Sequence, residues 1–289
     1  MGNIATNTQS QIQILRERGM ELDFDEAKVK EFLLDIGYYR LGFYWNPFEI
    51  DDQHTFKPGT KFSDIIKLYY LDVDLRNILL KFTSRIEINF RTKVVYYVSN
   101  TNINSPTWFA DPSVVKNGFL DNLNDIYNDR FKKTNKPIKK HHAKYINDKY
   151  APAWKTLEYF TFGNILNIYK NLKDLSIKER ISNEYGVVMV DKFINFMETV
   201  ILVRNNCAHG DILFDLRTPK GISVIPSIVF NNKDRSSLDS CIRVISYFLG
   251  KISLNRKNEL DEAINSIFSK YKDNQEIKSI IEQKINYIY

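Results

Sequence analysis

The longest regular pattern of hydrophobic and polar positions lies between about residues 61 and 98. Apolar side chains recur from Ile65 and Leu75 to Phe90 and Tyr97 at steps that match multiples of the helical repeat. Because an α-helix turns once in about 3.6 residues, this spacing places them on one face over about ten turns. The pattern predicts one long amphipathic helix, or two helices joined at a kink.

Shorter helical patterns lie on both sides of this segment. Asp23 or Asp25 can cap a helix that ends at Gly37, and the aromatic-rich residues that follow predict a buried corner between two helices at 38–48. Further helices are expected at about 112–130, 151–172, 176–185, 187–208, 236–252, 257–271 and 273–287. The fold class predicted from these patterns is mainly all-α.

Two segments do not follow a helical pattern. Residues 1–20 are polar as far as Ile12, which predicts a partly ordered tail that leads into a short element. Residues 220–230 alternate β-branched side chains around Pro226, which predicts a short β-hairpin or an edge strand. Since there is no repeat and no clear boundary, we expect one domain over 21–289, in which 220–289 is an extension packed on the core.

Composition supports a helical protein and is compatible with an anionic partner. Of 289 residues only 11 are Gly and 8 are Pro, whereas 13% are aromatic, which favours long helices over a loop-rich β fold. The net charge of +6 suits a polyanion without proving one. Two cysteines make no disulfide framework, and there is neither a signal peptide nor an apolar run of about 18 residues. We therefore expect a cytoplasmic chain without a membrane partner.

A basic segment at 130–145 is the first candidate for RNA binding. It holds six lysines and no acidic residue: Lys132, Lys133, Lys136, Lys139, Lys140 and Lys144. Its composition predicts an exposed loop, which either binds RNA phosphates and releases their counterions or is merely solvated. The adjacent His141 and His142 point in different directions on any regular element, and no cysteine lies near them. A metal site is therefore not expected.

The second candidate is the segment RNNCAH (residues 204–209), which follows an apolar run and precedes Gly210. Arg204 continues a helical stripe of core residues that includes Met197 and Val200, so it must be paired or face a cleft. Asn205 and His209 are four residues apart, which lets the amide contact the imidazole. Gly210 is the residue type expected just past a helix end.

These residue types suit RNA cleavage without a metal or a cofactor. A guanidinium can stabilise charge on a phosphoryl group, and an imidazole can move a proton at neutral pH while the 2′-OH attacks its own phosphate. One copy of the segment offers one such histidine, so a symmetric dimer would supply the base and the acid together. The simpler alternative is a structural Arg204 that pairs with Glu87 or Glu158, next to a histidine that only caps the helix.

Four stretches in order carry a resemblance to a known family: IGYYRLGFYWNPF (36–48), LDVDLRNILLKFTSRIEINFR (71–91), APAWKTLEYFTFGNIL (151–166) and LVRNNCAHGDILFDLR (202–217). The chain resembles the Abi-like (abortive infection, AbiD/AbiF type) proteins of the HEPN superfamily. That resemblance implies an all-α HEPN core, a homodimeric RNase site, and a toxin or phage-defence role, with a small noncoding RNA as possible inhibitor.

Carried over residue by residue, the family motif falls on Arg204, Asn205 and His209 as catalytic residues. The Gly210–Asp211 pair departs from the family, in which a second His or Asn and then Arg or Leu often follow the histidine. A non-cleaving module that binds RNA or a partner protein remains the alternative. Three further residues of helical cores are additional candidates: Arg76, Glu87 and Glu158.

Overall fold

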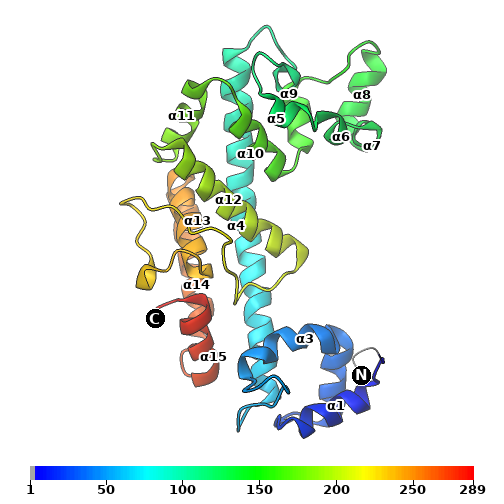
Figure 1. The fold of residues 1–289 in the computed structure, drawn as a ribbon, viewed down its shortest axis with the longest axis vertical. Helices are drawn as coiled ribbons and strands as arrows, with labels where there is room; N and C mark the ends of the chain where they lie inside the picture. The colour runs from blue at the N-terminus through cyan, green and yellow to red at the C-terminus, as the bar shows by residue number, and fades with distance from the viewer. Residues whose placement is uncertain (1–3) are drawn as a thin grey trace.

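The fold is built on one helix of 40 residues, α4 (Phe62–Thr101), which runs along the long axis of the computed structural model (Figure 1). The structure describes residues 4–289. Neither Gly nor Pro interrupts the sequence of α4, so no residue forces a kink. Its apolar stripe is fully buried at Leu75, Ile86 and Val94. Of the two predicted alternatives, one long helix is confirmed, and the pair of helices joined at a kink is not formed.

An N-terminal block, residues 4–61, packs against the first turns of α4. Its elements are α1 (Thr8–Glu17), α2 (Glu26–Phe32), a π-helical turn (Leu33–Gly37), α3 (Tyr38–Trp45) and a 3-10 turn (Asn46–Phe48). Asp25 caps α2 by accepting a hydrogen bond of 2.8 Å from the Lys28 N–H. The predicted tail therefore contains a helix, α1, whose Ile12 and Leu15 are fully buried.

The other end of α4 carries a set of short helices. They are a 3-10 turn (Trp108–Ala110), α5 (Asn117–Leu120), α6 (Leu123–Ile126), α7 (Asp129–Thr134), α8 (Lys136–Lys144) and α9 (Ala153–Thr156). The single helix predicted at 112–130 is wrong, because the chain there forms separate one-turn helices. The helix predicted at 151–172 is broken by a 3-10 turn (Leu157–Tyr159), after which Thr161 caps α10 (Phe162–Asn171) through the Asn164 N–H at 3.2 Å.

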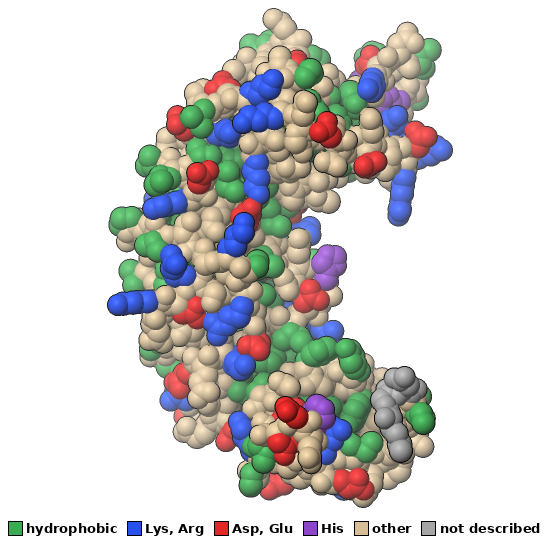
Figure 2. Space-filling view, in the orientation of Figure 1, with side chains coloured by type: hydrophobic (Ala, Val, Ile, Leu, Met, Phe, Trp, Pro, Cys, Tyr) green, Lys and Arg blue, Asp and Glu red, His purple; other side chains and the backbone are tan. Residues whose placement is uncertain are grey.

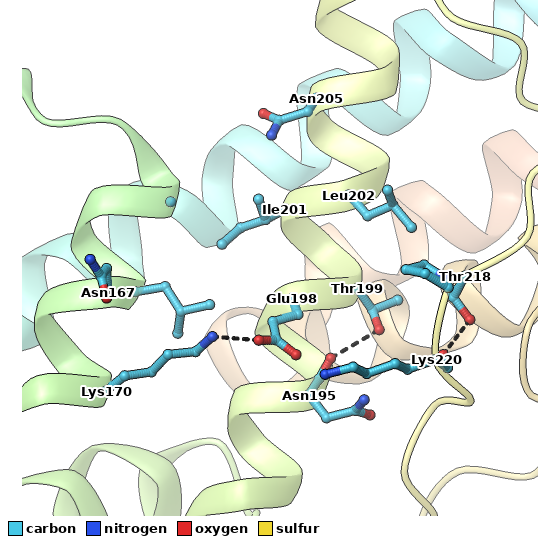
Figure 3. A pocket seen from close by; sticks show the side chains of 13 residues that line it. Asn167, Lys170, Asn195, Glu198, Thr199, Ile201, Leu202, Asn205, Thr218 and Lys220 are labelled. Carbon is cyan, nitrogen blue, oxygen red and sulfur yellow. Dashed lines mark hydrogen bonds and ion pairs between the residues drawn. The ribbon is translucent and has the colours of Figure 1, made fainter. Parts of the chain in front are cut away.

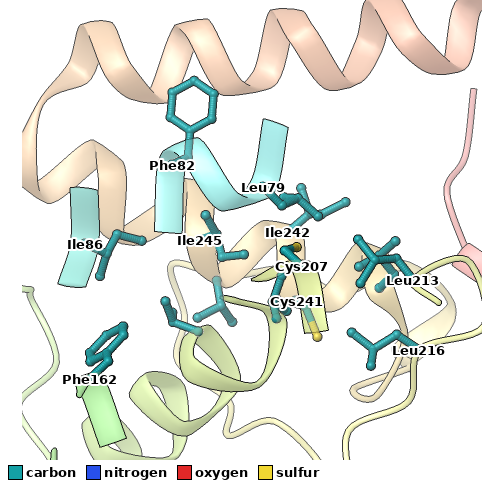
Figure 4. Packing of buried hydrophobic residues seen from close by; sticks show 14 of the residues in the cluster. Leu79, Phe82, Ile86, Phe162, Cys207, Leu213, Leu216, Cys241, Ile242 and Ile245 are labelled. Carbon is teal, nitrogen blue, oxygen red and sulfur yellow. The ribbon is translucent and has the colours of Figure 1, made fainter. Parts of the chain in front are cut away.

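The remaining helices and turns follow α10 in the chain, and the helices among them pack along the length of α4. They are α11 (Leu175–Glu184), α12 (Val190–His209), α13 (Leu238–Ile252), α14 (Leu254–Ser269), α15 (Gln275–Ile280), a 3-10 turn (Asn231–Lys233) and a π-helical turn (Ile281–Ile285). Figure 4 shows Leu79 and Ile86 of α4 in one apolar cluster with Ile242 and Ile245 of α13. Cys207 and Cys241 belong to the same cluster, where burial raises the pKa of each thiol to about 12.

The hairpin or edge strand predicted at 220–230 is absent. Residues 4–289 contain no β-sheet, only three isolated bridges, so the all-α fold class is confirmed. The segment is an extended loop that buries Ile222, Ile225 and Ile228. Its backbone binds other elements: the Ser223 N–H donates to the Asn195 side chain at 2.6 Å. Alternating apolar residues therefore anchor a loop on helices here, because no neighbouring strand is available to pair with it.

The N-terminal block and the α5–α8 helices extend to the same side of α4 (Figure 1). In the space-filling view the molecule is hollowed between these two parts (Figure 2). The C-terminal end of α12 lies beside α4 along this hollow (Figure 1). No helix within residues 4–289 is both long enough and apolar enough to cross a membrane.

Candidate functional site

The RNNCAH segment forms the last two turns of α12. His209 is the last helical residue, and Gly210 follows it in the left-handed region at φ 74°. Glycine adopts this conformation without steric cost, so the N–H groups of Gly210 and Asp211 can bond back to carbonyls of the final turn at 3.3 and 2.9 Å. The predicted helix end is therefore confirmed, and His209 lies exposed at its tip.

Arg204 forms an ion pair, which is one of the two arrangements that its position on the core-facing stripe of the helix predicted. Its Nε donates to Glu87 Oε2 of α4 at 3.2 Å, and the side chain stays 31% exposed. The other oxygen of Glu87 accepts from Arg91 at 2.7 Å. Glu158, the alternative partner, lies exposed on the 3-10 turn before α10. Glu87 thus serves two arginines, only one of which, Arg204, is open to solvent.

The contact predicted between Asn205 and His209 does not form. Asn205 Oδ1 instead accepts a hydrogen bond of 3.2 Å from Arg204 Nη1. The His209 imidazole makes no hydrogen bond to any residue in the described part of the chain. Asn205 therefore orients the arginine, whereas the histidine is left free to meet another molecule.

The loop after His209 is held by charged groups of α4 and α3. Asp72 Oδ1 accepts from the Leu213 and Phe214 N–H groups at 2.9 and 2.8 Å. Arg76 donates to the Asp211 carbonyl at 3.1 Å, and Arg40 donates to the Gly210 carbonyl. We call Asp72, Arg76 and Arg40 the α12 clamp. They fix the backbone on which His209 sits.

Within the clamp, Asp72 and Arg76 form an almost fully buried ion pair, whereas Arg40 is only partly buried. Arg76 pairs with Asp72 Oδ2, and Tyr44 donates to the same oxygen at 3.0 Å. Burial raises the pKa of Asp72, an effect that Arg76 and the two loop N–H groups oppose. Burial together with the Asp72 charge raises the pKa of Tyr44 to about 12. The sequence analysis named Arg76 as an additional candidate for the site, but it did not identify the roles of Asp72, Arg40 and Tyr44. All three lie within the stretches that carry the family resemblance, which was the available signal.

A cavity of about 540 Å³ lies beside the segment, between α10, α12 and the loop at 218–220. Figure 3 shows Asn205 at one end of it, Ile201 and Leu202 along α12, and the ion pair of Lys170 with Glu198 across it. Neither Arg204 nor His209 lines this cavity. It therefore shares only Asn205 with the candidate catalytic residues.

The basic segment is helical, so the predicted loop is wrong. Its lysines lie on α7 and α8, which are separated by Asn135 and pack against each other. On α8 the side that holds Ile138 and His141 is buried, and the lysines are exposed at Lys136, Lys139, Lys140 and Lys144. On α7, Lys133 is exposed, whereas Lys132 is half-buried and 3.7 Å from Asp129. The segment forms helices because Ile138 and His141 recur at helical spacing and give α8 an anchoring face.

The adjacent histidines do point to different partners, as predicted. His141 Nε2 lies 2.9 Å from Asp148, and His142 Nε2 lies 2.8 Å from the Tyr127 hydroxyl. Within residues 4–289 no three His, Cys, Asp or Glu side chains are grouped so that they could hold a metal ion. These histidines are structural links that hold α8 to its neighbours.

The family model of Abi-like proteins matches residues 31–215, which is well over half of the chain. The matched region begins in α2, includes the α12 clamp and the RNNCAH segment, and ends in the loop that the clamp holds. No curated protein and no solved structure matches the chain. The chain therefore belongs to the Abi-like protein family, which confirms the resemblance and associates it with abortive infection.

Proposed function

We propose that the chain is a metal-independent endoribonuclease of the HEPN type that acts as an abortive-infection effector. The observation that carries the proposal is the free imidazole of His209 at the clamped tip of α12, one turn beyond the solvent-accessible Arg204. In the reaction the 2′-oxygen of RNA loses its proton and attacks the adjacent phosphorus. The bond to the 5′-oxygen breaks, that oxygen gains a proton, and a cyclic phosphate remains.

Each residue has a role that its surroundings support. His209 transfers the proton, because imidazole is the side chain best suited to gaining and losing a proton near neutral pH. Arg204 stabilises charge on the phosphoryl oxygens with the guanidinium edge that Glu87 does not occupy. Asn205 positions Arg204 through its 3.2 Å hydrogen bond. Glu87 is a positioning residue, because it is buried and acts through its ion pair with Arg204.

Two copies of the chain would complete the site. His209 and Arg204 are about 140° apart around the axis of α12, so one helix cannot aim both at one phosphate without distortion. A two-fold axis near the tip of α12 would bring two histidines and two arginines together. Beside the segment, Ile201 and Leu202 are only half-buried, which leaves apolar surface for a second copy to cover.

RNA would reach the site across the hollow of the molecule. The exposed lysines of α7 and α8 lie on one of the two parts that border this hollow (Figures 1 and 2). Phosphate contacts of this kind carry little sequence information but raise affinity and on-rate. The same surface would hold a small noncoding RNA that restrains the enzyme.

The test is cleavage of a labelled RNA by purified protein in the presence of EDTA. We expect products that end in a cyclic phosphate, and a loss of rate of at least about a hundredfold for His209→Ala. Asn206→Ala is the matched control, because Asn206 lies on the same turn and only bonds back to the Leu202 carbonyl at 2.8 Å. Equal rates for native protein and His209→Ala would refute the assignment of His209.

The second candidate function is a module that binds RNA without cleaving it. It is favoured by the ion pair of Arg204 with Glu87, because this pair alone explains why an arginine lies on the core-facing stripe of α12, without a role in binding a substrate. In that case the native chain leaves RNA intact, and His209→Ala binds RNA as tightly as the native chain.

A further inference from the structure

A second cavity, of about 490 Å³, lies between α3, the residues that follow it and the loop after the RNNCAH segment. Its lining includes Tyr39 and Phe43 of α3 as well as Ile212 and Phe214 of that loop. The α12 clamp fixes the same loop, so the cavity is joined to the tip of α12 by a short and well-held piece of chain. It is separate from the cavity beside Asn205, with which it shares no residue.

Two aromatic side chains of α3, Tyr39 and Phe43, are exposed to an extent that packing does not explain. Tyr39 is 82% exposed and Phe43 is 41% exposed, and their rings contact edge to face with centroids 5.3 Å apart. Hydrophobic side chains gather over α3 where it borders the hollow (Figure 2). Flat aromatic rings at the edge of a cavity can stack on nucleobases, because every base has a π-face.

A glycine keeps the cavity open. Gly42 lies within α3, where glycine costs up to about 1 kcal/mol relative to alanine, and its φ does not require glycine. A Cβ placed there would touch only the Trp45 ring, at an ordinary 3.7 Å. The backbone would thus accept a side chain, and the absence of one leaves space in the cavity that Gly42 lines.

The polar groups of the cavity match the edge of one base. The side chain of Glu49 is 7% exposed, and its partners are His54 at 3.0 Å and the Asn46 amide at 3.4 Å. A carboxylate offers about four acceptor positions, so Glu49 keeps capacity for further donors. Guanine presents two adjacent donors, N1–H and the exocyclic N2–H₂, whereas adenine and cytosine present a ring acceptor beside their amino group. Arg18, which also lines the cavity, can donate to the guanine O6 or N7 acceptors.

We infer that this cavity binds a guanine base, which stacks on one ring of the Tyr39–Phe43 pair and is read at its edge by Glu49 and Arg18. The inference rests on the proposed function only in taking RNA as the molecule that carries the base. The cavity lies beside the loop that follows His209. A guanosine bound there would therefore determine which phosphate of the RNA strand reaches the catalytic residues. The cavity would thereby give the nuclease a sequence preference.

The experiment uses the full-length His209→Ala chain, so that RNA stays intact. Calorimetry measures the binding of guanosine 5′-monophosphate and adenosine 5′-monophosphate. Competition with a short oligouridine that carries one guanosine distinguishes a base in RNA from a free nucleotide. We expect guanosine monophosphate to bind at least about tenfold more tightly than adenosine monophosphate. Glu49→Gln should bring the two affinities close together.

Gly42→Leu is the blocking variant and Gly42→Ala its control. Leucine has a higher helix propensity than glycine, so circular dichroism should show an intact fold while nucleotide binding falls about tenfold or more. Alanine should keep most of the affinity. Tyr39→Ala removes a stacking surface that is 82% exposed and should weaken binding without lowering stability.

The failures of the two proposals are distinguishable. If guanosine monophosphate does not bind, or binds equally well to Gly42→Leu, the cavity is not a guanine site, even where the native chain cleaves RNA through His209. If the nucleotide binds and Gly42→Leu abolishes binding while the native chain cleaves no RNA, the nuclease proposal fails and the guanine site stands.

Discussion

At the scale of single residues, Glu87 has the most consequential environment. It pairs with Arg204 on one side and with Arg91 on the other, and Arg91 also donates to the Phe160 carbonyl at 3.1 Å. The two arginines differ in burial, since Arg91 is 9% exposed and the side chain of Arg204 is 31% exposed. The same carboxylate therefore supports the fold through one partner and the candidate site through the other.

Substitution of Arg204 should consequently cost little stability. In Arg204→Ala the Glu87 carboxylate keeps Arg91, so we expect a loss of about 1 kcal/mol or less, the usual value for a partly exposed pair. Glu87→Ala strands the buried Arg91 guanidinium and should cost about 3 kcal/mol. Urea unfolding of the two variants measures the difference. Equal losses would show that Arg204 is the main structural partner of Glu87.

The sequence predicted part of this arrangement. The helical phase of Arg204 required a partner or a cleft, and the partner exists. The choice between Glu87 and Glu158 was left open, because it depends on the 3-10 turn that separates α9 from α10 and turns Glu158 to solvent. A local pattern could not show that turn, nor that Asn205 faces Arg204 and leaves His209 free.

At the scale of elements, the α12 clamp links three segments that are far apart in the chain. Asp72 of α4 contacts Tyr44 of α3 and the backbone of the loop at 213–214. Sequence periodicity predicted α4 and α12 well, because their apolar stripes are long and regular. It could not predict the clamp, since charged residues in a helical stripe look the same whether they are solvated or paired across the core.

Loss of the Asp72 carboxylate should destabilise the fold more than loss of the Tyr44 hydroxyl that contacts it. Asp72→Ala leaves the buried Arg76 guanidinium without its carboxylate partner and two loop N–H groups without their acceptor, which should cost about 3–5 kcal/mol. Tyr44→Phe removes two hydrogen bonds, the one to Asp72 Oδ2 and the one that the hydroxyl accepts from Arg76 at 3.2 Å, but leaves the ion pair of Arg76 with Asp72, and should cost about 2 kcal/mol. Thermal unfolding compares the two. If Asp72→Ala is as mild as Tyr44→Phe, the clamp does not hold the end of α12.

The lysines of α7 and α8 make a separate prediction for RNA binding. Lys139→Glu with Lys140→Glu should weaken binding to single-stranded RNA, and the slope of log K against log salt should shrink by about 0.7 for each phosphate that is no longer neutralised. The control is Lys251→Glu with Lys272→Glu, which makes the same charge change at exposed lysines on the C-terminal helices and the turn after them. Equal effects of the two pairs would mean that only net charge matters, and that α7 and α8 form no specific RNA surface.

At the scale of the whole molecule, the hollow shape places three candidate features along one side. The tip of α12 lies between the N-terminal block and the α5–α8 helices (Figure 1); the lysines lie on α7 and α8, and the second cavity lies between the N-terminal block and the loop after α12. The shape itself was not predictable from the sequence, because short helices such as α5 and α6 replaced the longer ones that the pattern indicated. A strand of RNA could contact all three features at once.

The composite site can be tested by mixing chains. If each active centre needs one histidine from each of two copies, activity should fall as the square of the native fraction when His209→Ala chains exchange with native ones. Equal amounts would leave about a quarter of the activity, whereas independent sites would leave about a half. Light scattering should first give a mass near twice the 34.0 kDa of one chain. A linear fall in activity would place a complete site within each chain, and the second proton transfer would then need another group near the tip of α12.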